Sequence, residues 1–352
     1  MTTPASNGRP WTVNGRFLSE PFSGVQRVAQ GFLRTLAGSE CHLACPSGTR
    51  PPWWSGPVTE LPLLPGRPGR MLWEQLQLPL RTRGPVLSLA NTGPLLRPDA
   101  VYIHDVAFRV HPEWFRASFR RTYGWVTARV AAASRRVLVN SRFTADELVR
   151  ILGVDTARIT VIRPGVDERF RRPPDEEIEQ LRGKRHLPDR FFLMVGSIDP
   201  RKGIDMAERA ALSTSVPLVV AGAAPSNFAD VPLPAHVIWL GPVSELELPA
   251  LYASATALVY PSRYEGFGLP PIEAMACGTP VIASDIPPLR ETVGDAALLV
   301  PADEADAWVE AARRVTASSA LRRELTESGL SRARAFSWEG AGRLLAEVLA
   351  IP

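Results

Sequence analysis

The sequence predicts an α/β protein with two doubly wound domains, each a parallel sheet covered by helices on both faces. At 352 residues the chain exceeds one ordinary core, so two domains of roughly 150 residues each are expected. Short, continuously apolar segments, typical of buried parallel strands, alternate with segments of helical periodicity. No apolar run reaches the ~18 residues that a membrane-spanning helix needs. Together these observations favour an α/β fold outside the membrane.

The composition is globular and the charge is mild. The chain is 45% hydrophobic and 22% charged, with a net charge of +4. This balance permits an anionic ligand but does not indicate nucleic acid, and no nucleic-acid partner is expected. Nearly all basic residues are arginines, and Lys184 and Lys202 are the only lysines. Three cysteines without metal-type spacing, and an N-terminus without a signal-peptide pattern, predict a cytoplasmic protein.

The first half of the chain, residues 1–165, is predicted to form an N-terminal Rossmann-like domain. Predicted strands cover residues 11–18, 41–45, 86–90, 100–104, 136–140 and 159–162, and predicted helices cover 25–36, 112–133 and 143–152. Residues 46–70, rich in proline, glycine and tryptophan, are expected to form a long surface loop. Aromatic residues interleave with arginines in 112–133, which would suit docking on an anionic membrane. A core-facing helix with a solvated basic face is favoured instead.

The second half, residues 166–335, repeats the alternation after a charged, proline-containing boundary at 163–175. Predicted strands cover residues 191–195, 217–221, 236–240, 257–260, 280–283 and 296–300, and predicted helices cover 204–212, 245–252 and two segments between 304 and 334. A last amphipathic helix is predicted over 336–350, with Trp338 near its start. The chain is therefore divided into 1–165, 166–335 and a terminal helix in 336–352.

The stretch 257–285 reads as a strand, a glycine loop, a short helix and a second strand. Gly266 and Gly268 allow the backbone to approach a ligand closely, and two prolines that follow suit a first helical turn. The predicted result is a row of backbone N–H groups at a helix N-terminus, which favours an anion. Glu265 precedes this loop and Glu273 lies in the helix. The spacing places these carboxylates at different depths, so we do not expect an acid/base pair.

A second loop supplies positive charge. Residues 196–203, GSIDPRKG, follow the 191–195 strand and hold Arg201 and Lys202. Alone these two would be read as a solvated basic turn. Because both loops lie at the carboxyl edge of one parallel sheet, amides and two cations together predict a diphosphate site. Glu273 is compatible with two roles, a favourable charge near a helix N-terminus or a hydrogen bond to a ribose diol.

The first domain offers two weaker candidates. Gly24 lies where a helix begins, so its loop could present amides to an anion, although an ordinary strand-to-helix turn explains it equally well. His104 and Asp105 close a predicted strand at the edge where parallel sheets bind ligands. The alternative for His104 is a hydrogen-bonded core histidine, and we favour a functional role because the topology directs this edge at a ligand.

Several common motifs of cofactor-binding, catalytic and metal sites are absent from the sequence. No G-x-G-x-x-G follows a strand, and there is no P-loop, no G-x-S-x-G elbow, no Asp-x-Asp clamp and no histidine cluster. These absences argue against a nicotinamide enzyme, a P-loop nucleotidase, an α/β-hydrolase and a zinc site. A diphosphate held without metal must be stabilised by amides, arginine and lysine.

These motifs resemble the retaining glycosyltransferases of the GT-B fold, which include bacterial mannosyltransferases and glycogen and sucrose synthases. The strongest match is E-x7-E, Glu265 to Glu273, within SRYEGFGLPPIEAMACGTPVIASD. Further matches in the same order are FSGVQRVA at 22–29, VNSRFTADEL at 139–148, VIRPGVD at 161–167 and PRKG at 200–203. The resemblance covers nearly the whole chain and implies two Rossmann-like domains facing across a cleft. Residues 1–165 would bind the acceptor, 166–335 would bind the donor, and 336–352 would cross back to the N-terminal domain.

The resemblance also implies roles for individual residues. Glu273 would bind the donor ribose, and His104 would contact the transferred sugar. The donor sugar and diphosphate would be held by Glu265 and the amides of Gly266, Phe267, Gly268 and Leu269. Arg201 and Lys202 would neutralise the departing diphosphate, Gly24 would bring its loop to the phosphates, and Asp105 would line the acceptor side. One departure is Ser197, where many members carry a cation, so neutralisation would rest on Arg201 and Lys202.

The implied activity is a retaining, metal-independent hexosyl transfer from a nucleotide-diphosphate sugar to a hydroxyl, with no further cofactor. The version LPPIEAMACGTPVI resembles mannosyltransferases that use GDP-mannose in bacterial polysaccharide or glycoconjugate biosynthesis. Alternatives are a UDP- or dTDP-sugar enzyme of natural-product or glycolipid synthesis, and an inactive nucleotide-binding homologue. A sugar phosphorylase is disfavoured because the chain is short and has few lysines to hold pyridoxal phosphate. The acceptor could be a carbohydrate, a lipid-linked sugar or a small molecule, and peripheral contact with the inner face of the membrane is an open alternative.

Overall fold

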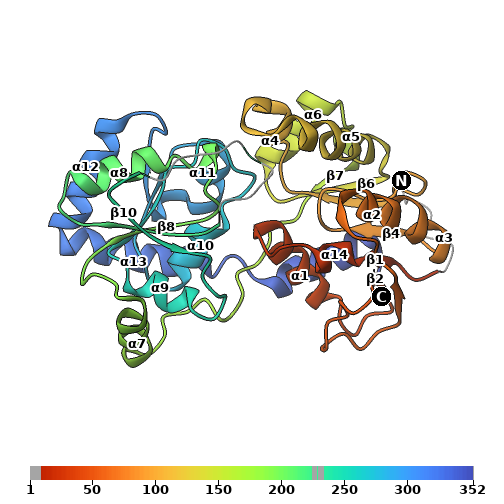
Figure 1. Ribbon diagram of the computed structural model, residues 1–352, viewed down its shortest axis with the longest axis horizontal. Helices are drawn as coiled ribbons and strands as arrows, with labels where there is room; N and C mark the ends of the chain where they lie inside the picture. The colour runs from red at the N-terminus through yellow and green to blue at the C-terminus, as the bar shows by residue number, and fades with distance from the viewer. Residues whose placement is uncertain (1–8, 224–227, 229–233, 352) are drawn as a thin grey trace. The chain divides into compact units, whose positions relative to one another are not determined.

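The computed structural model describes residues 9–351, apart from 224–227, 229–233 and the side chain of Arg67. Residues 1–8, in which no signal peptide is expected, lie outside this range. The chain forms two compact units (Figure 1). Unit 1 comprises Met1–Val110, Ala117–Gly165 and Ser337–Pro352, and unit 2 comprises His111–Arg116 and Val166–Phe336. The last helix in the chain therefore packs with the N-terminal part of the sequence.

Unit 1 contains a seven-stranded parallel sheet in the order β3-β2-β1-β4-β5-β6-β7. Its strands are β1 (Thr12–Asn14), β2 (His42–Pro46), β3 (Val58–Leu61), β4 (Val86–Ser88), β5 (Ala100–Ile103), β6 (Arg136–Val139) and β7 (Ile159–Val161). Its longer helices are α1 (Gly24–Thr35), α2 (Gly66–Leu72), α5 (Ala117–Ala133), α6 (Arg142–Leu152) and α14 (Trp338–Leu349), with short helices α3 (Leu78–Arg81) and α4 (Ala107–Val110). The strand order reverses direction between β1 and β4, which makes this pair the switch point of the sheet.

Unit 2 contains a six-stranded parallel sheet in the order β10-β9-β8-β11-β12-β13. Its strands are β8 (Phe192–Val195), β9 (Leu218–Ala221), β10 (Val237–Gly241), β11 (Ala257–Tyr260), β12 (Val281–Ser284) and β13 (Leu298–Val300). Its helices are α7 (Asp175–Arg185), α8 (Ile204–Leu212), α9 (Leu248–Ser254), α10 (Leu269–Ala276), α11 (Pro287–Val293), α12 (Ala305–Ala317) and α13 (Ser319–Ala333). Its switch point lies between β8 and β11. The predicted fold class, two doubly wound parallel sheets, is confirmed.

Side chains of the unit 2 strands alternate between two apolar cores, as a sheet covered on both faces requires. On β8, Phe192 and Met194 pack in the core that contains residues of α8 and α12. Leu193, between them, packs in the core that contains residues of α7, α9 and α10. All three are nearly fully buried. Burial on both faces explains why these strands appear in the sequence as continuous apolar runs.

Two predictions for the first hundred residues are wrong in part. The strand predicted over 11–18 ends at Asn14, because the Asn14 side chain accepts a hydrogen bond from the Arg16 amide (3.2 Å) and caps a 3-10 helix, Gly15–Ser19. The loop predicted over 46–70 contains β3 and the start of α2. Strand β3 lies at the sheet edge and is only partly buried. It therefore lacks the continuous apolar run by which a central strand is recognised in a sequence.

The helix predicted over 112–133 is also wrong at its start, since α5 begins at Ala117. Pro112–Trp114 form a 3-10 turn, and Phe115 makes an antiparallel bridge with Phe228, which places this segment in unit 2. Helices α7 and α11 were not predicted at all. Among the residues described, no helix has both the length and the apolar character needed to cross a membrane.

Candidate active site

The switch point of unit 2 brings two loops together at the carboxyl ends of β8 and β11. The Arg263 amide in the second loop donates a hydrogen bond to the Arg201 carbonyl in the first (2.7 Å). Gly203 permits this close approach: its φ is +61°, and an added Cβ would lie 2.2 Å from the Pro261 carbonyl oxygen. Backbone contact between the loops therefore fixes the side chains that they carry.

Lys202, Tyr260 and Glu265 form a buried triad at this point. The Lys202 ammonium donates to Glu265 Oε1 (2.5 Å) and to the Tyr260 hydroxyl (3.0 Å). The Tyr260 hydroxyl donates to the same Glu265 oxygen (2.6 Å). Lys202 and Glu265 are 7% and 8% exposed. Charged side chains are rarely so buried unless paired, so the triad is a built feature and not a solvated basic turn.

The triad keeps Glu265 ionised. Burial alone would raise the pKa of this carboxyl, but the charges of Lys202 and Arg201 and the hydrogen bonds from Lys202 and Tyr260 outweigh it and hold the pKa below its ordinary value. Burial and the neighbouring carboxylate raise the pKa of Tyr260, so its hydroxyl keeps its proton. Glu265 can therefore accept hydrogen bonds from a ligand but is unsuited to donate a proton.

Arg201 has its own carboxylate partner, Asp199. The guanidinium binds Asp199 through two parallel hydrogen bonds, Nε to Oδ1 (2.9 Å) and one terminal nitrogen to Oδ2 (3.0 Å). Asp199 also accepts from the Arg201 amide (3.0 Å) and the Ser197 hydroxyl (2.5 Å). Arg201 further lies over the Phe228 ring, 4.5 Å from its centroid. Ser197, the residue noted above as a departure from the family pattern, thus helps to hold the carboxylate that orients Arg201.

The glycine loop reaches α10 through a left-handed residue. Gly268 has φ of +96°, and an added Cβ would lie 2.4 Å from Leu289. The Thr292 hydroxyl donates to the Phe267 carbonyl (2.6 Å) and anchors the loop. Pro270 and Pro271 occupy the first turn of α10 and have no N–H groups, so the amides predicted to face an anion are those of the four residues before them. These residues are Gly266, Phe267, Gly268 and Leu269.

Glu273 lies deeper, on α10, and is 1% exposed. Its carboxylate accepts a hydrogen bond from the Tyr252 hydroxyl on α9 (2.9 Å). This contact adds a third role to the two considered from the sequence: Glu273 ties α10 to α9. The triad and Glu273 thus share one unit and flank one loop, but they hold different partners.

The candidates in unit 1 lie at the carboxyl edge of its sheet. His104 follows β5, is 5% exposed, and its Nε2 donates to the Leu89 carbonyl (2.9 Å). Burial lowers its pKa despite that hydrogen bond and the charge of Asp105, so the ring is neutral at pH 7 and its Nδ1 is an acceptor. The Asp105 carboxylate accepts a hydrogen bond from the amide of Ala107, the first residue of α4 (3.0 Å). Gly24 is exposed at the start of α1.

Sequence reasoning missed a buried polar network at the switch point of unit 1. Arg16, just after β1, donates to Glu74 Oε1 (3.0 Å) and Thr92 Oγ1 (2.8 Å), and it forms an ion pair with Glu20. Asn14 donates to the same Glu74 oxygen (2.8 Å). Glu74 lies on a π-helical turn, Trp73–Gln77, a rare conformation that is frequent at functional sites. The available signal was the position of Arg16 after a strand.

Comparison with known proteins agrees with this geometry. The model for Glycosyl transferases group 1 matches residues 176–332, and the model for Glycosyltransferase Family 4 matches residues 22–170. Between them only residues 1–21, 171–175 and 333–352 are unmatched. The first range contains the triad and both loops of unit 2, and the second contains His104 and the polar network except Asn14, Arg16 and Glu20.

Individual proteins give the same result. The chain is 32% identical to the O-antigen chain mannosyltransferase RfbU of Salmonella typhimurium over 65% of its length and 64% of that protein. It is 33% identical to the D-inositol 3-phosphate glycosyltransferase of Actinosynnema mirum over 60% of its length and 56% of that protein. The chain thus spans about three fifths of these two relatives. Anabaena HepE, solved with UDP-glucose, superimposes with a TM-score of 0.77 at 17% identity, covering 97% of this chain and 99% of the other. The chain therefore belongs to the glycosyltransferases that combine a family 4 N-terminal domain with a group 1 C-terminal domain.

Proposed function

We propose that the protein is a retaining hexosyltransferase that moves mannose from GDP-mannose to a hydroxyl group of a growing surface polysaccharide. The observation that carries this proposal is the buried Lys202–Tyr260–Glu265 triad beside a glycine loop at the switch point of unit 2. Such a point is where doubly wound sheets bind nucleotides. The similarity to an O-antigen mannosyltransferase supports mannose as the sugar.

In the proposed mechanism, charge develops on the diphosphate as the C1–oxygen bond of the donor breaks. Lys202, Arg201 and the amides of residues 266–269 stabilise that charge. Glu265 stays ionised and accepts hydrogen bonds from sugar hydroxyls. The acceptor hydroxyl forms its bond to C1 on the same face and passes its proton to a diphosphate oxygen, so the anomeric configuration is kept. Retention without a covalent intermediate is supported by the hydrogen bonds that Lys202 and Tyr260 both donate to Glu265 Oε1, because they lower the nucleophilicity of that carboxylate.

Unit 1 supports a neutral acceptor over a phosphorylated one. At its switch point the Arg16 guanidinium is paired with both Glu20 and Glu74. A cation compensated in this way gains little from an added phosphate, whereas the surrounding hydroxyl, amide and carboxylate groups suit sugar hydroxyls. A saccharide acceptor is therefore favoured over an inositol phosphate such as the one named for the Actinosynnema relative.

A donor and acceptor matrix tests the proposal. Purified protein would be incubated with GDP-mannose, UDP-glucose or dTDP-glucose and with neutral or phosphorylated saccharides, and products would be followed by mass spectrometry. We expect transfer from GDP-mannose to a neutral saccharide, and NMR of the anomeric centre should show the donor's configuration. Transfer from UDP-glucose alone would reject mannose, inversion would reject the mechanism, and nucleotide binding without transfer or hydrolysis would indicate an inactive homologue.

A further inference from the structure

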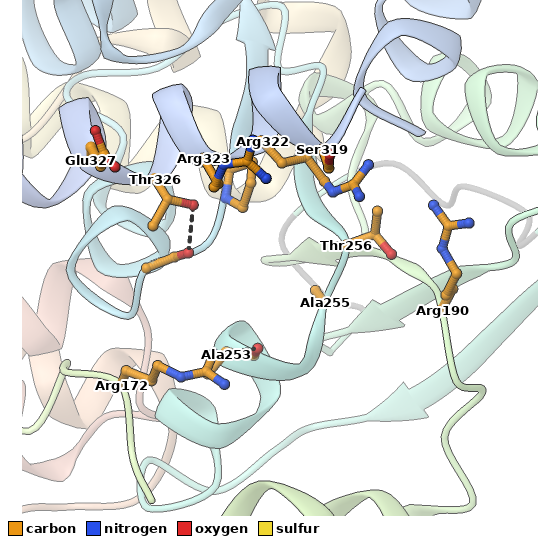
Figure 2. Close-up of a pocket in the computed structure, with 12 residues that line it drawn as sticks. Arg172, Arg190, Ala253, Ala255, Thr256, Ser319, Arg322, Arg323, Thr326 and Glu327 are labelled. Carbon is orange, nitrogen blue, oxygen red and sulfur yellow. Dashed lines mark hydrogen bonds between the residues drawn. The ribbon is translucent and has the colours of Figure 1, made fainter. Parts of the chain in front are cut away.

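A basic hollow lies at the edge of the unit 2 sheet opposite the triad. It has a volume of about 400 Å³ and is lined by residues that precede β8, β11 and β12 and by the start of α13 (Figure 2). The triad, in contrast, follows the carboxyl ends of β8 and β11. A four-residue strand spans ~13 Å, so the hollow and the triad are separate places on one sheet. Nothing in the proposed transfer reaction uses this hollow.

Four arginines line the hollow: Arg172, Arg190, Arg322 and Arg323. Figure 2 shows Arg190 and Arg322 on one side and Arg172 on the other. Arg172 pairs with Asp175 (2.8 Å). For the other three, no carboxylate in the described part of the chain lies within ion-pair distance. One acidic residue, Glu327, shares the lining. The hollow therefore carries an excess of positive charge that the protein itself does not balance.

Two of these guanidinium groups are held side by side. Arg190 and Arg322 each donate a hydrogen bond to the same carbonyl oxygen, that of Thr316 (3.1 and 3.0 Å). Arg322 also donates to the Val315 carbonyl (2.6 Å). Both carbonyls lie in the last turn of α12, where positive charge is favourable. The two arginines therefore cap the C-terminus of that helix and bring two positive charges close together. A guanidinium has five N–H donors, and these hydrogen bonds use one nitrogen of each arginine, so donors remain for a ligand.

From this geometry we propose that the hollow binds a phosphate-bearing ligand with at least two anionic groups, such as a diphosphate. Guanidinium forks match phosphate oxygens bidentately, and arginine is over-represented where proteins bind phosphate. The hollow is larger than a single phosphate requires and lies within the usual range of ligand pockets. The N-terminus of α13, which begins at Ser319 and has no acidic residue in its first turn, adds the positive end of a helix dipole.

The test separates this site from the donor site. In the full chain carrying Lys202→Met, which weakens the donor site, pyrophosphate binding would be measured by calorimetry with and without Arg190→Gln and Arg323→Gln. Both arginines are exposed, so the variants should fold. The control is Arg313→Gln, an exposed arginine on α12 that also donates to a backbone carbonyl (3.5 Å) but lies outside the hollow. We expect the double substitution to weaken pyrophosphate binding about tenfold or more and the control to leave it unchanged.

A second arm distinguishes two sources of phosphate. Sedimentation with phosphatidylcholine vesicles, with and without phosphatidylglycerol, would be compared for the same variants. Loss of pyrophosphate binding supports a small soluble ligand, and loss of binding to the anionic vesicles alone supports a lipid headgroup. If the Arg190→Gln, Arg323→Gln protein binds both probes as the control does, the proposal is wrong. When Arg190→Gln and Arg323→Gln are placed in a chain that keeps Lys202, transfer activity should be unchanged. A failure of the phosphate-site proposal would therefore leave the proposed function untouched.

Discussion

Replacing Lys202 should destabilise unit 2 through the carboxylate that it leaves behind. The ammonium lies 2.5 Å from Glu265 Oε1, and at an effective dielectric constant of about 20 two unit charges at that distance attract by about 6 to 7 kcal/mol. Most of this offsets the cost of burying both charges. Removing one partner of such a buried pair typically costs about 3 to 5 kcal/mol. Because the Tyr260 hydroxyl still donates to Glu265, we expect Lys202→Met to cost about 3 kcal/mol.

A double-mutant cycle isolates the pair. Lys202→Met, Glu265→Gln and the double variant would be unfolded in urea, with hydrogen exchange of the β8 and β11 peptides reporting on unit 2 alone. The double variant should cost about 2 to 3 kcal/mol less than the sum of the single variants, since it leaves no unpaired charge. The other lysine provides a matched control. Lys184 pairs with Glu247 (2.8 Å) but its side chain is 69% exposed, so Lys184→Met should cost less than about 1 kcal/mol.

Additive effects of Lys202→Met and Glu265→Gln, within about 0.5 kcal/mol, would refute the reasoning, because the triad would then carry no coupling. The same variants separate stability from chemistry. Lys202→Met should lower kcat for transfer more than it raises the donor KM, since the charge on the diphosphate grows as the bond to the sugar breaks.

Four further predictions concern other sites. Gly203→Ala should destabilise unit 2 by more than about 2 kcal/mol in urea, because its φ is +61° and the new Cβ would meet a carbonyl oxygen at 2.2 Å; Gly183→Ala in α7, with nothing within 4 Å, should instead stabilise by about 0.5 kcal/mol. Burial holds the pKa of His104 below 6.5, so the unfolded chain binds a proton first and stability falls as pH drops below 6.5. His104→Gln should flatten the change in urea midpoint between about pH 7.5 and 5.5, and an unaltered slope would contradict a neutral buried ring. Glu273→Gln should raise the donor KM about tenfold with little change in kcat if it holds the ribose, whereas a lower urea midpoint with a normal KM would leave it as a tie between α10 and α9. Asp199→Asn should tighten binding of the nucleotide diphosphate product about tenfold in calorimetry, and unchanged affinity would show that Arg201 never meets the phosphates.

The fold was predictable because most of the buried strands are short and apolar and alternate along the chain with segments of helical periodicity. Strand β11 matches its predicted bounds, and the topology of parallel sheets then places the loops after β8 and β11 at one edge. This topological rule was sufficient to predict that Lys202 lies near Glu265. Pattern reasoning failed where burial is partial or structure is local, as at β3, whose edge position leaves it half exposed. It also failed at residues 112–116, where tertiary contact with Phe228 overrides helical periodicity.

The polar partners of the site could not be read from the sequence. Glu74 is 58 residues away from Arg16 in the sequence, and it lies on a π-helical turn that the hydrophobic pattern of the sequence does not predict. Asp199 lies two residues before Arg201, yet only the backbone of the 3-10 turn shows that its carboxylate faces the guanidinium and not solvent. Sequence pattern identifies which residues share an edge. It does not reveal which of their charged groups already form ion pairs with one another.

That distinction changes how the donor loops are understood. Lys202 and Arg201 carry two positive charges, and Glu265 and Asp199 carry two negative charges held ionised by low pKa values, so the four residues are neutral together. A diphosphate entering this edge does not meet two uncompensated cations. In the proposed reaction its affinity comes from the amides of the glycine loop and from sharing Lys202 with Glu265, which would weaken that pair as the donor binds. A neutral cluster binds the ground state modestly and responds most when charge grows on the leaving group, as catalysis by differential binding requires. In the proposed reaction, the buried contact whose loss destabilises the Lys202 variants is therefore also the contact that makes the charge of Lys202 act mainly in the transition state.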